Sequence, residues 1–598
     1  MSAAVQPPAA EREAASAARQ PALGSLARRH WLLTALLLVV AASWLVWASA
    51  VPFGEAPDEP SHLEVAQFVA AHGRLPLFGP DADQYVRLDQ VGIPIESHAL
   101  APPLPYLLDG ALIRLLPLPP VAAARLGSLL AALAAVALSY ALAQVVFDNG
   151  QTTRPLALAT AALVAAVPEV SFLAATVNSD VVALAAALGA ACLWPRVGRP
   201  LGALAFGLAL GLVLLAKYTA YPVAALALLA AAWPLARARR ESGRRYASVR
   251  LGLVALGAVL VAGPWLLRNW ALYGQPWPLG VSEAAFRALV PAVPVPGAPG
   301  SQQLLSADYA RSWWEITFRS FWAGFGRVDL FAPAWCYALI LAGLTVALWG
   351  LLRTLGDAAR RASLAAALRR PAGLLLVGWP LAVWLAVFAA SLGRYYPAHG
   401  RYLIPALPPL ALGLALGWQA AARRRSVPIP SPPPALGPLA PWLLVAGVAA
   451  LNVYCLLAVV VPHYYGPAAT RVTVTVDEPR PGDLATGSVP VRGWAVVSGR
   501  DGWQLGQIGG APAWHAAATT VWATLDGEPI PMLAGGTGAA RPDLARALGT
   551  PAVAMAGFTW QLDARALPSG LHTLAICVSD PAASDTVCVP IPLRVEGD

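Results

Sequence analysis

The sequence predicts a polytopic α-helical membrane protein that ends in an all-β domain. Of its 598 residues, 58% are hydrophobic and only 12% are charged, against about 25% charged residues in ordinary soluble domains. Apolar windows of about 20 residues recur over the first three quarters of the chain, and each is long enough to cross a hydrocarbon core of about 30 Å. Because these runs are continuous and do not alternate with a period of two, they exclude a transmembrane β-barrel.

The apolar windows predict about eleven membrane spans. They cover residues 31–51, 121–146, 153–169, 179–195, 200–216, 219–235, 249–266, 332–353, 372–391, 402–421 and 440–461. When the sides alternate, the arginine-rich loops such as 237–245 and 423–425 fall in the cytoplasm. We therefore expect a multi-pass plasma-membrane protein with a disordered cytoplasmic tail over 1–25. The net charge of +9 comes from these loops and does not indicate a nucleic-acid partner.

Two long loops of the predicted membrane domain, residues 26–465, fall on the outer side. The first, 52–120, contains the apolar stretches 61–71 and 104–116, which we interpret as helices lying along the outer interface. The second, 267–330, is rich in Pro, Trp and Gly, and its paired aromatic residues suit an interfacial belt.

Residues 468–598 change character and predict an antiparallel β-sandwich on the outer side. Short alternating runs indicate strands at 471–477, 489–497, 521–525, 558–562 and 572–578, with turn signals between them. Cys577 and Cys588 flank a predicted turn in this domain. They either form a disulfide there or remain as thiols, and the sequence leaves both alternatives open.

The most informative motif is the acidic run Glu55-Ala-Pro-Asp58-Glu59-Pro-Ser-His62, directly after the first predicted span. Ionisable side chains at a membrane indicate a functional site by default. The predicted topology places further polar residues on the same outer side: Asn178, Asp180, Lys217, Arg268 and the segment 394–401.

The order of these motifs resembles the GT-C superfamily of integral membrane glycosyltransferases, in particular the branch of protein O-mannosyltransferases and aminoarabinose transferases. The segments that carry the resemblance are 57–64, 96–108, 168–180, 215–219, 264–270 and 400–405, within residues 30–420. The resemblance implies a sugar linked to polyprenyl phosphate as donor, used on the outer face of the membrane. The acceptor is a protein, a lipid or a glycan.

The resemblance also implies roles for individual residues. Asp58 is the expected general base, and Glu59 assists it, orients the acceptor or binds a cation. The expected substrate-binding residues are His62, His98, Asn178, Asp180, Lys217, Arg268, Arg401 and Tyr402. Lys and Arg bind phosphate, but the same cations also reach toward the membrane interface in many proteins. The alternative for the two carboxylates is to cap the helix expected at 61–71.

The sequence contains no compact His/Cys ligand motif, so we expect no required metal or other cofactor. A divalent cation held by His62 and His98 with one of the carboxylates stays an alternative. Two other function classes also remain open. One is a transporter or flippase of the same lipids, and the other is a non-catalytic anchor that presents the β-sandwich.

Overall fold

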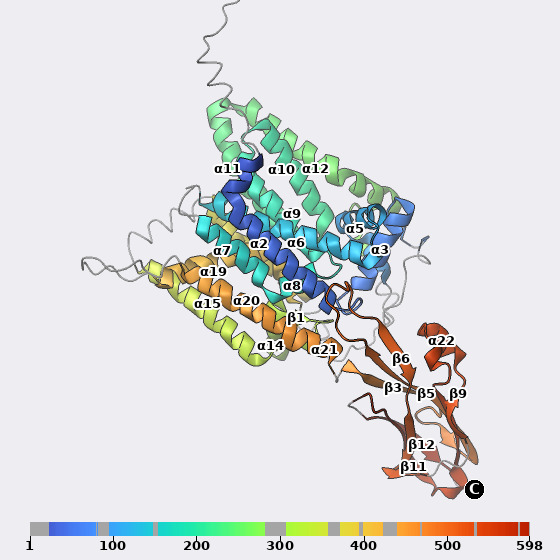
Figure 1. Ribbon diagram of the computed structural model, residues 1–598. Helices are drawn as coiled ribbons and strands as arrows, with labels where there is room; N and C mark the ends of the chain where they lie inside the picture. The colour runs from blue at the N-terminus through green and yellow to red at the C-terminus, as the bar shows by residue number, and fades with distance from the viewer. Residues whose placement is uncertain are drawn as a thin grey trace, which may run out of the picture.

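The computed structural model describes residues 23–78, 80–81, 95–147, 154–281, 307–356, 371–393, 399–422, 439–466, 469–530, 535–583 and 586–596. These residues form a large helical part and a β-rich C-terminal part that projects from one end of it (Figure 1). Residues 1–22 of the predicted tail lie outside the described residues.

Most of the helical part consists of α-helices, the longest of which are apolar. They are α2 (Leu23–Ala50), α3 (Glu59–His72), α5 (Leu104–Leu115), α6 (Pro120–Val146), α7 (Arg154–Ala166), α8 (Pro168–Ala174), α9 (Asp180–Leu193), α10 (Pro200–Ala216), α11 (Tyr221–Ser242), α12 (Arg244–Tyr273), α14 (Ala307–Ala323), α15 (Ala334–Leu355), α18 (Trp379–Gly393), α19 (Leu407–Ala422), α20 (Ala440–Tyr454) and α21 (Val461–Tyr465). Short turns of helix join some of them, including η1 (Ile95–Leu100), η3 (Tyr218–Ala220) and η5 (Gly400–Ala406).

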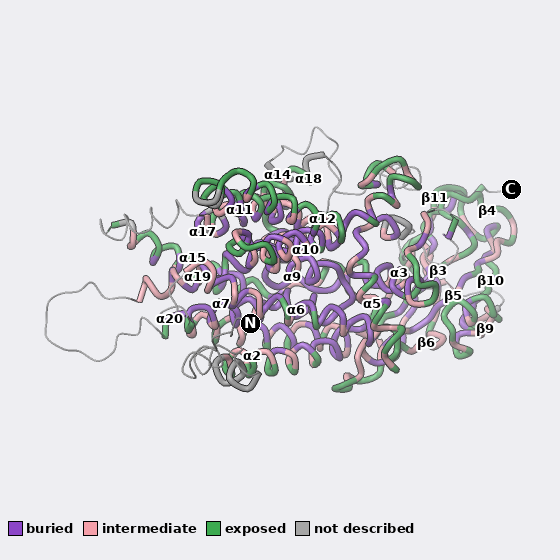
Figure 2. The backbone as a smooth tube through the Cα atoms, turned by 90° about the horizontal axis from the view of Figure 1, so that it is seen from above, coloured by how far each residue is buried: buried purple, intermediate pink, exposed green. Residues whose placement is uncertain are grey.

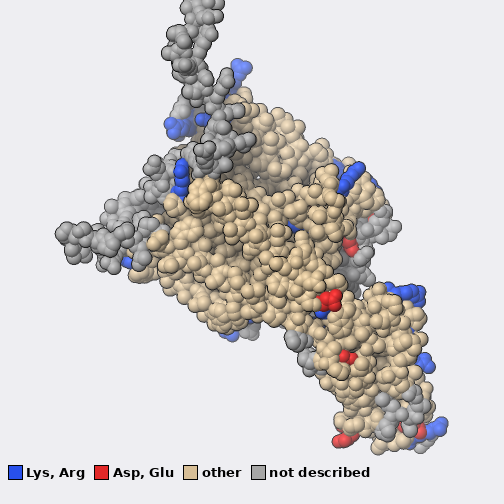
Figure 3. Space-filling model, in the orientation of Figure 1, with Lys and Arg blue, Asp and Glu red and all other residues tan. Residues whose placement is uncertain are grey.

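The predicted class, a polytopic helical membrane protein, is confirmed. Within the described residues, seven helices are long and apolar enough to cross a membrane, and the bent pair α7–α8 makes eight if it is one span. The other predicted spans, 179–195, 200–216 and 372–391, coincide with the shorter helices α9, α10 and α18. Figure 3 shows the corresponding surface, a broad area with few charged side chains on the helical part.

The bend between α7 and α8 begins at Val167, whose backbone is extended, and α8 starts with Pro168. A residue before proline avoids the helical region, and proline suits the first turn of a helix, so the sequence Val-Pro favours this break. The two helices meet at 68°. The bend brings the segment after α8, which contains Asn178, to the end of the bundle where α3 begins, and the Val177 N–H bonds there to Glu59.

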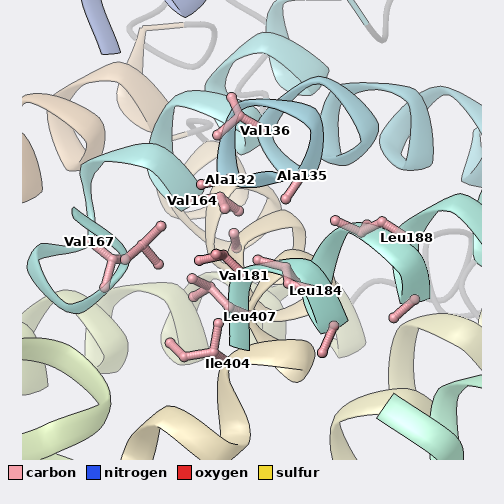
Figure 4. Packing of buried hydrophobic residues seen from close by; sticks show 14 of the residues in the cluster. Ala132, Ala135, Val136, Val164, Val167, Val181, Leu184, Leu188, Ile404 and Leu407 are labelled. Atoms are coloured by element: carbon pink, nitrogen blue, oxygen red, sulfur yellow. The ribbon is translucent and has the colours of Figure 1, made fainter. Parts of the chain in front are cut away.

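The core of the helical part is built from small and branched apolar side chains. Ala132, Val164, Val181 and Leu407 meet there from α6, α7, α9 and α19 (Figure 4). Buried residues occupy the centre of the bundle, and exposed residues follow its outer surface (Figure 2). At the contact of α15 with α19, Gly350 lies so close to the Gly417 backbone that a side chain would not fit. Such small residues allow membrane helices to approach closely.

The C-terminal part contains two five-stranded sheets that face each other across one apolar core. The first sheet has the order β3 (Arg471–Glu478), β5 (Ser488–Arg500), β10 (Gly557–Asp563), β9 (Gly535–Ala539), with β6 (Ala513–Ala517) also on β5. The second has the order β4 (Leu484–Ala485), β12 (Val587–Val595), β11 (Gly570–Ser579), β7 (Thr520–Leu525), β8 (Glu528–Pro529). All five predicted strands are present, and among the described strands only β4 and β12 pair in parallel. Cys577 and Cys588 lie opposite each other on β11 and β12 and form a disulfide, which decides between the two alternatives.

Candidate functional site

Asp58 occupies the position before the first residue of α3. Its backbone is left-handed, with φ 61° and ψ 7°, and its side chain makes no capping hydrogen bond to the helix. A left-handed conformation is uncommon outside glycine and costs about 1 kcal/mol or more. The carboxylate instead accepts a hydrogen bond from Arg401, with 2.6 Å between Oδ2 and Nη2. The capping alternative therefore does not describe Asp58.

Arg401 is buried in η5, with only 5% of its surface exposed. Its guanidinium also donates to the Pro57 carbonyl at 3.4 Å and to the Tyr402 hydroxyl at 3.2 Å. Gly400, the residue before it, donates its N–H to Ser320 Oγ at 2.8 Å and touches the backbone of α14 at Phe321. A side chain at position 400 would not fit there. The position of Arg401 is therefore fixed by the contact between η5 and α14.

Lys217 lies between α10 and η3 and reaches the same place from another direction. Its Nζ donates to Asp180 Oδ1 at 2.7 Å, and 18% of the Lys217 side chain is exposed against 1% of the Asp180 side chain. Lys217 Nζ lies 5.3 Å from the centre of the Tyr402 ring, and Arg401 Cζ lies 5.0 Å from it. Tyr402 thus holds two cations close to its ring, where the π-electrons favour positive charge.

Two histidines face Asp58 from α3 and η1. The rings of His62 and His98 meet edge to face with 4.6 Å between their centres. His62 Nδ1 lies 2.9 Å from the Tyr106 hydroxyl. One potential ligand atom from each of Asp58, His62 and His98 lies within 4.8 Å of the others. This donor set is of a kind that suits a divalent transition metal, which imidazole and carboxylate both bind.

These side chains surround one hollow of about 150 Å³ at the end of the bundle. Its walls include Asp58, His62, His98, Lys217 and Tyr402. They come from α3, η1, the end of α10 and η5, which lie far apart in the sequence. The structure therefore brings together one carboxylate, two histidines, a lysine and three tyrosines (Tyr106, Tyr218 and Tyr402), with Arg401 buried behind them.

The electrostatics of Asp58 favour its charged form. The Asp58 carboxylate is partly withdrawn from water, which raises its pKa, but the neighbouring positive charge of Arg401 outweighs this effect and lowers the pKa of Asp58 well below its ordinary value. Burial and the neighbouring His98 lower the pKa of His62. At neutral pH the hollow therefore contains an ionised carboxylate beside a neutral imidazole.

Glu59, the second predicted catalytic residue, points away from the hollow. Its side chain is fully buried and forms a two-pronged ion pair with Arg125 of α6, at 2.9 and 3.0 Å. The same carboxylate accepts N–H groups of Gly54 and Val177, at 3.0 and 2.9 Å. These contacts hold the loop before α3 against α6 and against the segment after α8.

Three other predicted site residues have different surroundings. Asn178 Oδ1 accepts the N–H groups of Asp180 and Val181 at 2.9 and 3.3 Å, so it caps the start of α9. Asp180 reaches the hollow only through its ion pair with Lys217. Arg268 of α12 donates to the carbonyls of Leu75 and Pro76 at 3.3 and 2.7 Å and does not line the hollow.

Four aromatic or ionisable residues of this region were not predicted as site residues: Tyr106 and Tyr218, which line the hollow, and Arg125 and His399. Arg125 is an ionisable residue inside a predicted span, a signal that indicates a partner within the protein. His399 precedes Gly400, and its ring lies 5.6 Å from that of Tyr402. Burial and the positive charge of Arg401 lower the pKa of His399 to about 3. In the sequence, the signal for His399 is its position two residues before Arg401.

Comparison with known proteins gives distant structural similarity. No family model matches the chain, and no curated protein sequence matches it. Among solved structures, it is similar to ArnT from Cupriavidus metallidurans bound to undecaprenyl phosphate, with a TM-score of 0.35, 16% identity, and coverage of 66% of this chain and 60% of that one. It is also similar to the oligosaccharyltransferase of Archaeoglobus fulgidus, with a TM-score of 0.40, 15% identity, and coverage of 72% of this chain and 55% of that one. For the arabinosyltransferase EmbB from Mycobacterium smegmatis the TM-score is 0.37, the identity 13%, and the coverage 71% of this chain and 37% of that one.

The chain thus spans about 60% or less of the length of these structures. The similarity is distant, so the chemistry of this chain has to follow from its own residues.

Proposed function

We propose that this protein is a membrane glycosyltransferase that moves a sugar from a polyprenyl-phosphate donor to an acceptor on the extracytoplasmic side. The observation that carries the proposal is that Asp58 and Lys217 line one small hollow, with Arg401 buried behind Asp58 and paired with it. A sugar on a lipid phosphate needs a base for the incoming acceptor and positive charge for the departing phosphate. The hollow offers both within one site.

The reaction is a direct displacement at the anomeric carbon. The acceptor hydroxyl or amine attacks that carbon, and its proton passes to Asp58. The bond between the anomeric carbon and the phosphate oxygen breaks, and the polyprenyl phosphate leaves with the bonding electrons. Lys217 and Arg401 stabilise the negative charge that develops on the phosphate.

Arg401 has a second part in this proposal. An Asp58 held by Arg401 has a lowered pKa and is a weak base. When the donor phosphate binds, it competes with Asp58 for the guanidinium. Loss of that partner raises the pKa of Asp58, and the carboxylate becomes a stronger base at the moment when the sugar is in place. Binding of the donor thereby switches on the base.

The proposed orientation follows the distribution of arginines. The arginine-rich segments such as 237–245 lie in the cytoplasm by the positive-inside rule, as does the N-terminus. The hollow and the β-sandwich then face the outside. A donor presented there carries its own activated leaving group, so no nucleotide is needed on that side of the membrane.

The mechanism uses no metal ion. Asp58, His62 and His98 are close enough to suit a divalent cation, which would supply Lewis-acid stabilisation of the phosphate. However, such a cation would bind the carboxylate that the proposal needs as a base, and it would lie beside the positive Arg401. Lys217 and Arg401 already supply the charge that a phosphate monoanion or dianion requires.

The test uses the full-length protein in lipid vesicles with a panel of polyprenyl-phosphate sugars and extracts of cell-envelope acceptors. Release of free polyprenyl phosphate is followed for the native chain, for Asp58→Asn and for Glu315→Gln. Glu315 is a matched control because its carboxylate is 59% exposed and pairs with Arg319 away from the hollow. We expect acceptor-dependent release that falls by about 10²- to 10⁴-fold in Asp58→Asn and stays native in Glu315→Gln.

Release that is unaffected by Asp58→Asn would remove Asp58 from the chemistry. Binding of the lipid donors without any turnover, together with movement of the lipid between the leaflets, would favour the transporter class instead.

A further inference from the structure

The β-sandwich is attached to the helical part at a place close to Asp58. The contact is made by residues 500–511, between β5 and β6, which we call the anchoring segment. In Figure 1 these strands run from the sandwich up to the end of the helical bundle. The segment meets residues 48–55, the end of α2 and the loop that leads into Asp58.

Backbone hydrogen bonds join the two segments. The Gly509 N–H donates to the Ala48 carbonyl at 3.0 Å, and the Gly509 carbonyl accepts the Phe53 N–H at 2.8 Å. One residue of the anchoring segment therefore binds both sides of the turn that ends α2. The indole N–H of Trp503 adds a bond of 3.2 Å to Ser49 Oγ.

The packing at this contact is tight. Gly510 has φ +77°, and a Cβ atom there would lie only 2.5 Å from the Tyr465 hydroxyl oxygen and 2.8 Å from Pro52 Cα. Gly506, in the same segment, has φ +92° but no atom within 4 Å of the place where its Cβ would be. Both glycines adopt a backbone that favours glycine, but only Gly510 needs to lack a side chain in order to touch the loop.

An ion pair continues the contact toward Asp58. Arg500 Nη2 lies 2.6 Å from Glu55 Oε1, three residues before Asp58. On its inner side the same loop is held by Arg125, which donates to the Ala48 and Val51 carbonyls at 2.9 and 2.8 Å. The chain leading to Asp58 is thus fixed between Arg125 on the inside and the anchoring segment on the outside.

We infer that the anchoring segment of the β-sandwich is a positioning element for Asp58. The inference rests on the proposed function of Asp58 as general base. Asp58 must keep a left-handed backbone and face the hollow, and the anchoring segment contacts the residues just before it. The segment acts through residues 48–55 and touches neither Lys217 nor the hollow itself. Small displacements of a catalytic group lower the rate by up to about 100-fold.

The test compares Gly510→Ala with Gly506→Ala in the full-length protein. Both substitutions carry the cost of a side chain on a left-handed backbone, but only Gly510→Ala pushes against Pro52. We expect kcat to fall about 10-fold or more in Gly510→Ala, with the donor KM within about twofold of native because Lys217 and Arg401 are untouched. Gly506→Ala should remain within about twofold of native in both.

A charge exchange gives a second test that does not depend on a glycine. Arg500→Glu places like charges side by side and should lower kcat, and adding Glu55→Arg should restore most of it. Arg492→Glu is the matched control, because Arg492 lies on the same strand and forms a solvent-exposed pair with Glu478 at 3.7 Å. Equal losses in Gly510→Ala and Gly506→Ala, a donor KM that rises with the fall in kcat, or no rescue by Glu55→Arg would overturn the inference.

Hydrogen exchange separates this inference from the proposed function. The Phe53 amide, bonded to Gly509, should exchange faster in Gly510→Ala and not in Gly506→Ala. If the native chain turns over no donor, the proposed function fails. The hydrogen-exchange rates alone then decide whether the anchoring segment positions this loop. Faster exchange at Phe53 in Gly510→Ala still supports positioning of this loop, and unchanged exchange contradicts it.

Discussion

Asp58 and Glu59 are neighbours in the sequence, but they belong to two different regions of the molecule. Glu59 lies in a closed cluster with Arg125 and two backbone N–H groups, and its side chain is 0% exposed. Asp58 lies at the wall of the hollow, where 43% of its side chain is exposed and Arg401 is its ion-pair partner. The Glu59 carboxylate forms its hydrogen bonds within the protein, whereas the Asp58 carboxylate is accessible to a ligand.

The difference teaches how to tell a structural ion pair from a functional one. A buried pair whose members are both fully hydrogen-bonded fixes a loop, and any change leaves a charge buried without a partner. The second kind of pair borders a hollow and consists of a buried cation and an accessible carboxylate. A substrate can replace the carboxylate as the partner of that cation. The left-handed backbone of Asp58, which no helix cap explains, fits the second kind.

The largest effect should come from breaking the closed cluster. Glu59→Gln leaves Arg125 buried with its charge unbalanced, since 1% of the Arg125 side chain is exposed. We expect the free energy of unfolding to fall by about 3–5 kcal/mol, as for other broken buried pairs. Thermal unfolding in detergent measures the change. A variant that unfolds at the native temperature would show that the cluster does not hold the loop.

The next effect concerns the pH dependence of the open pair. Arg401 keeps the pKa of Asp58 below its ordinary value of about 3.9, so Asp58 in the free enzyme stays ionised as the pH falls to that value. The acid limb of kcat/KM in the native chain should therefore lie below about pH 4. In Arg401→Gln, burial is no longer outweighed by the guanidinium, and we expect the acid limb to move above pH 4. Identical limbs in the two proteins would separate Asp58 from the rate.

The sign of the stability effect follows from the same lowered pKa. The Asp58–Arg401 pair stabilises the fold above the pKa of Asp58 in the unfolded chain, and this contribution is lost as the pH falls through the lower folded value.

A smaller effect distinguishes Asp58 from Glu59 at the level of folding. Asn adopts the left-handed backbone as readily as Asp, and its Oδ1 can still accept the hydrogen bond from Arg401. Arg401 is buried, but 43% of the Asp58 side chain is exposed, so Asp58→Asn should lower the free energy of unfolding by about 1–2 kcal/mol, less than Glu59→Gln does. Measured beside Glu59→Gln under the same conditions, it tests whether the two neighbouring carboxylates have separate roles. A similar loss in both variants would place Asp58 in the structural cluster.

The smallest effect is expected from chelation. Because the proposed mechanism uses Lys217 and Arg401 for the phosphate and Asp58 as the base, EDTA should leave the rate of polyprenyl phosphate release within about twofold. The measurement needs a control in which Mn²⁺ or Zn²⁺ is added back. A loss that the added metal restores would instead assign Asp58, His62 and His98 to a metal site.

Much of the architecture could be predicted from local signals. The continuous apolar windows predicted a membrane protein. The length of an apolar run decides whether it can cross a bilayer, whichever helices it packs against. Alternating residues gave the five predicted strands, and the acidic run after the first span marked the site. Arg401 in the motif Gly400-Arg401-Tyr402 could also be predicted as a site residue, because a guanidinium group suits phosphate.

The sequence by itself showed which charged residues fall at the ends of the predicted spans. Such residues indicate a functional site, because a charge in a membrane is costly. Only the tertiary structure decided which of them share a site. Asp58 and Glu59 differ by one position along the chain, but the turn into α3 sends one side chain to Arg401 and the other to Arg125. Likewise, the contact between the β-sandwich and residues 48–55 joins positions more than 440 residues apart, as in the pair of Arg500 with Glu55. Such choices depend on the directions in which packed elements point their side chains, and a linear pattern does not contain those directions.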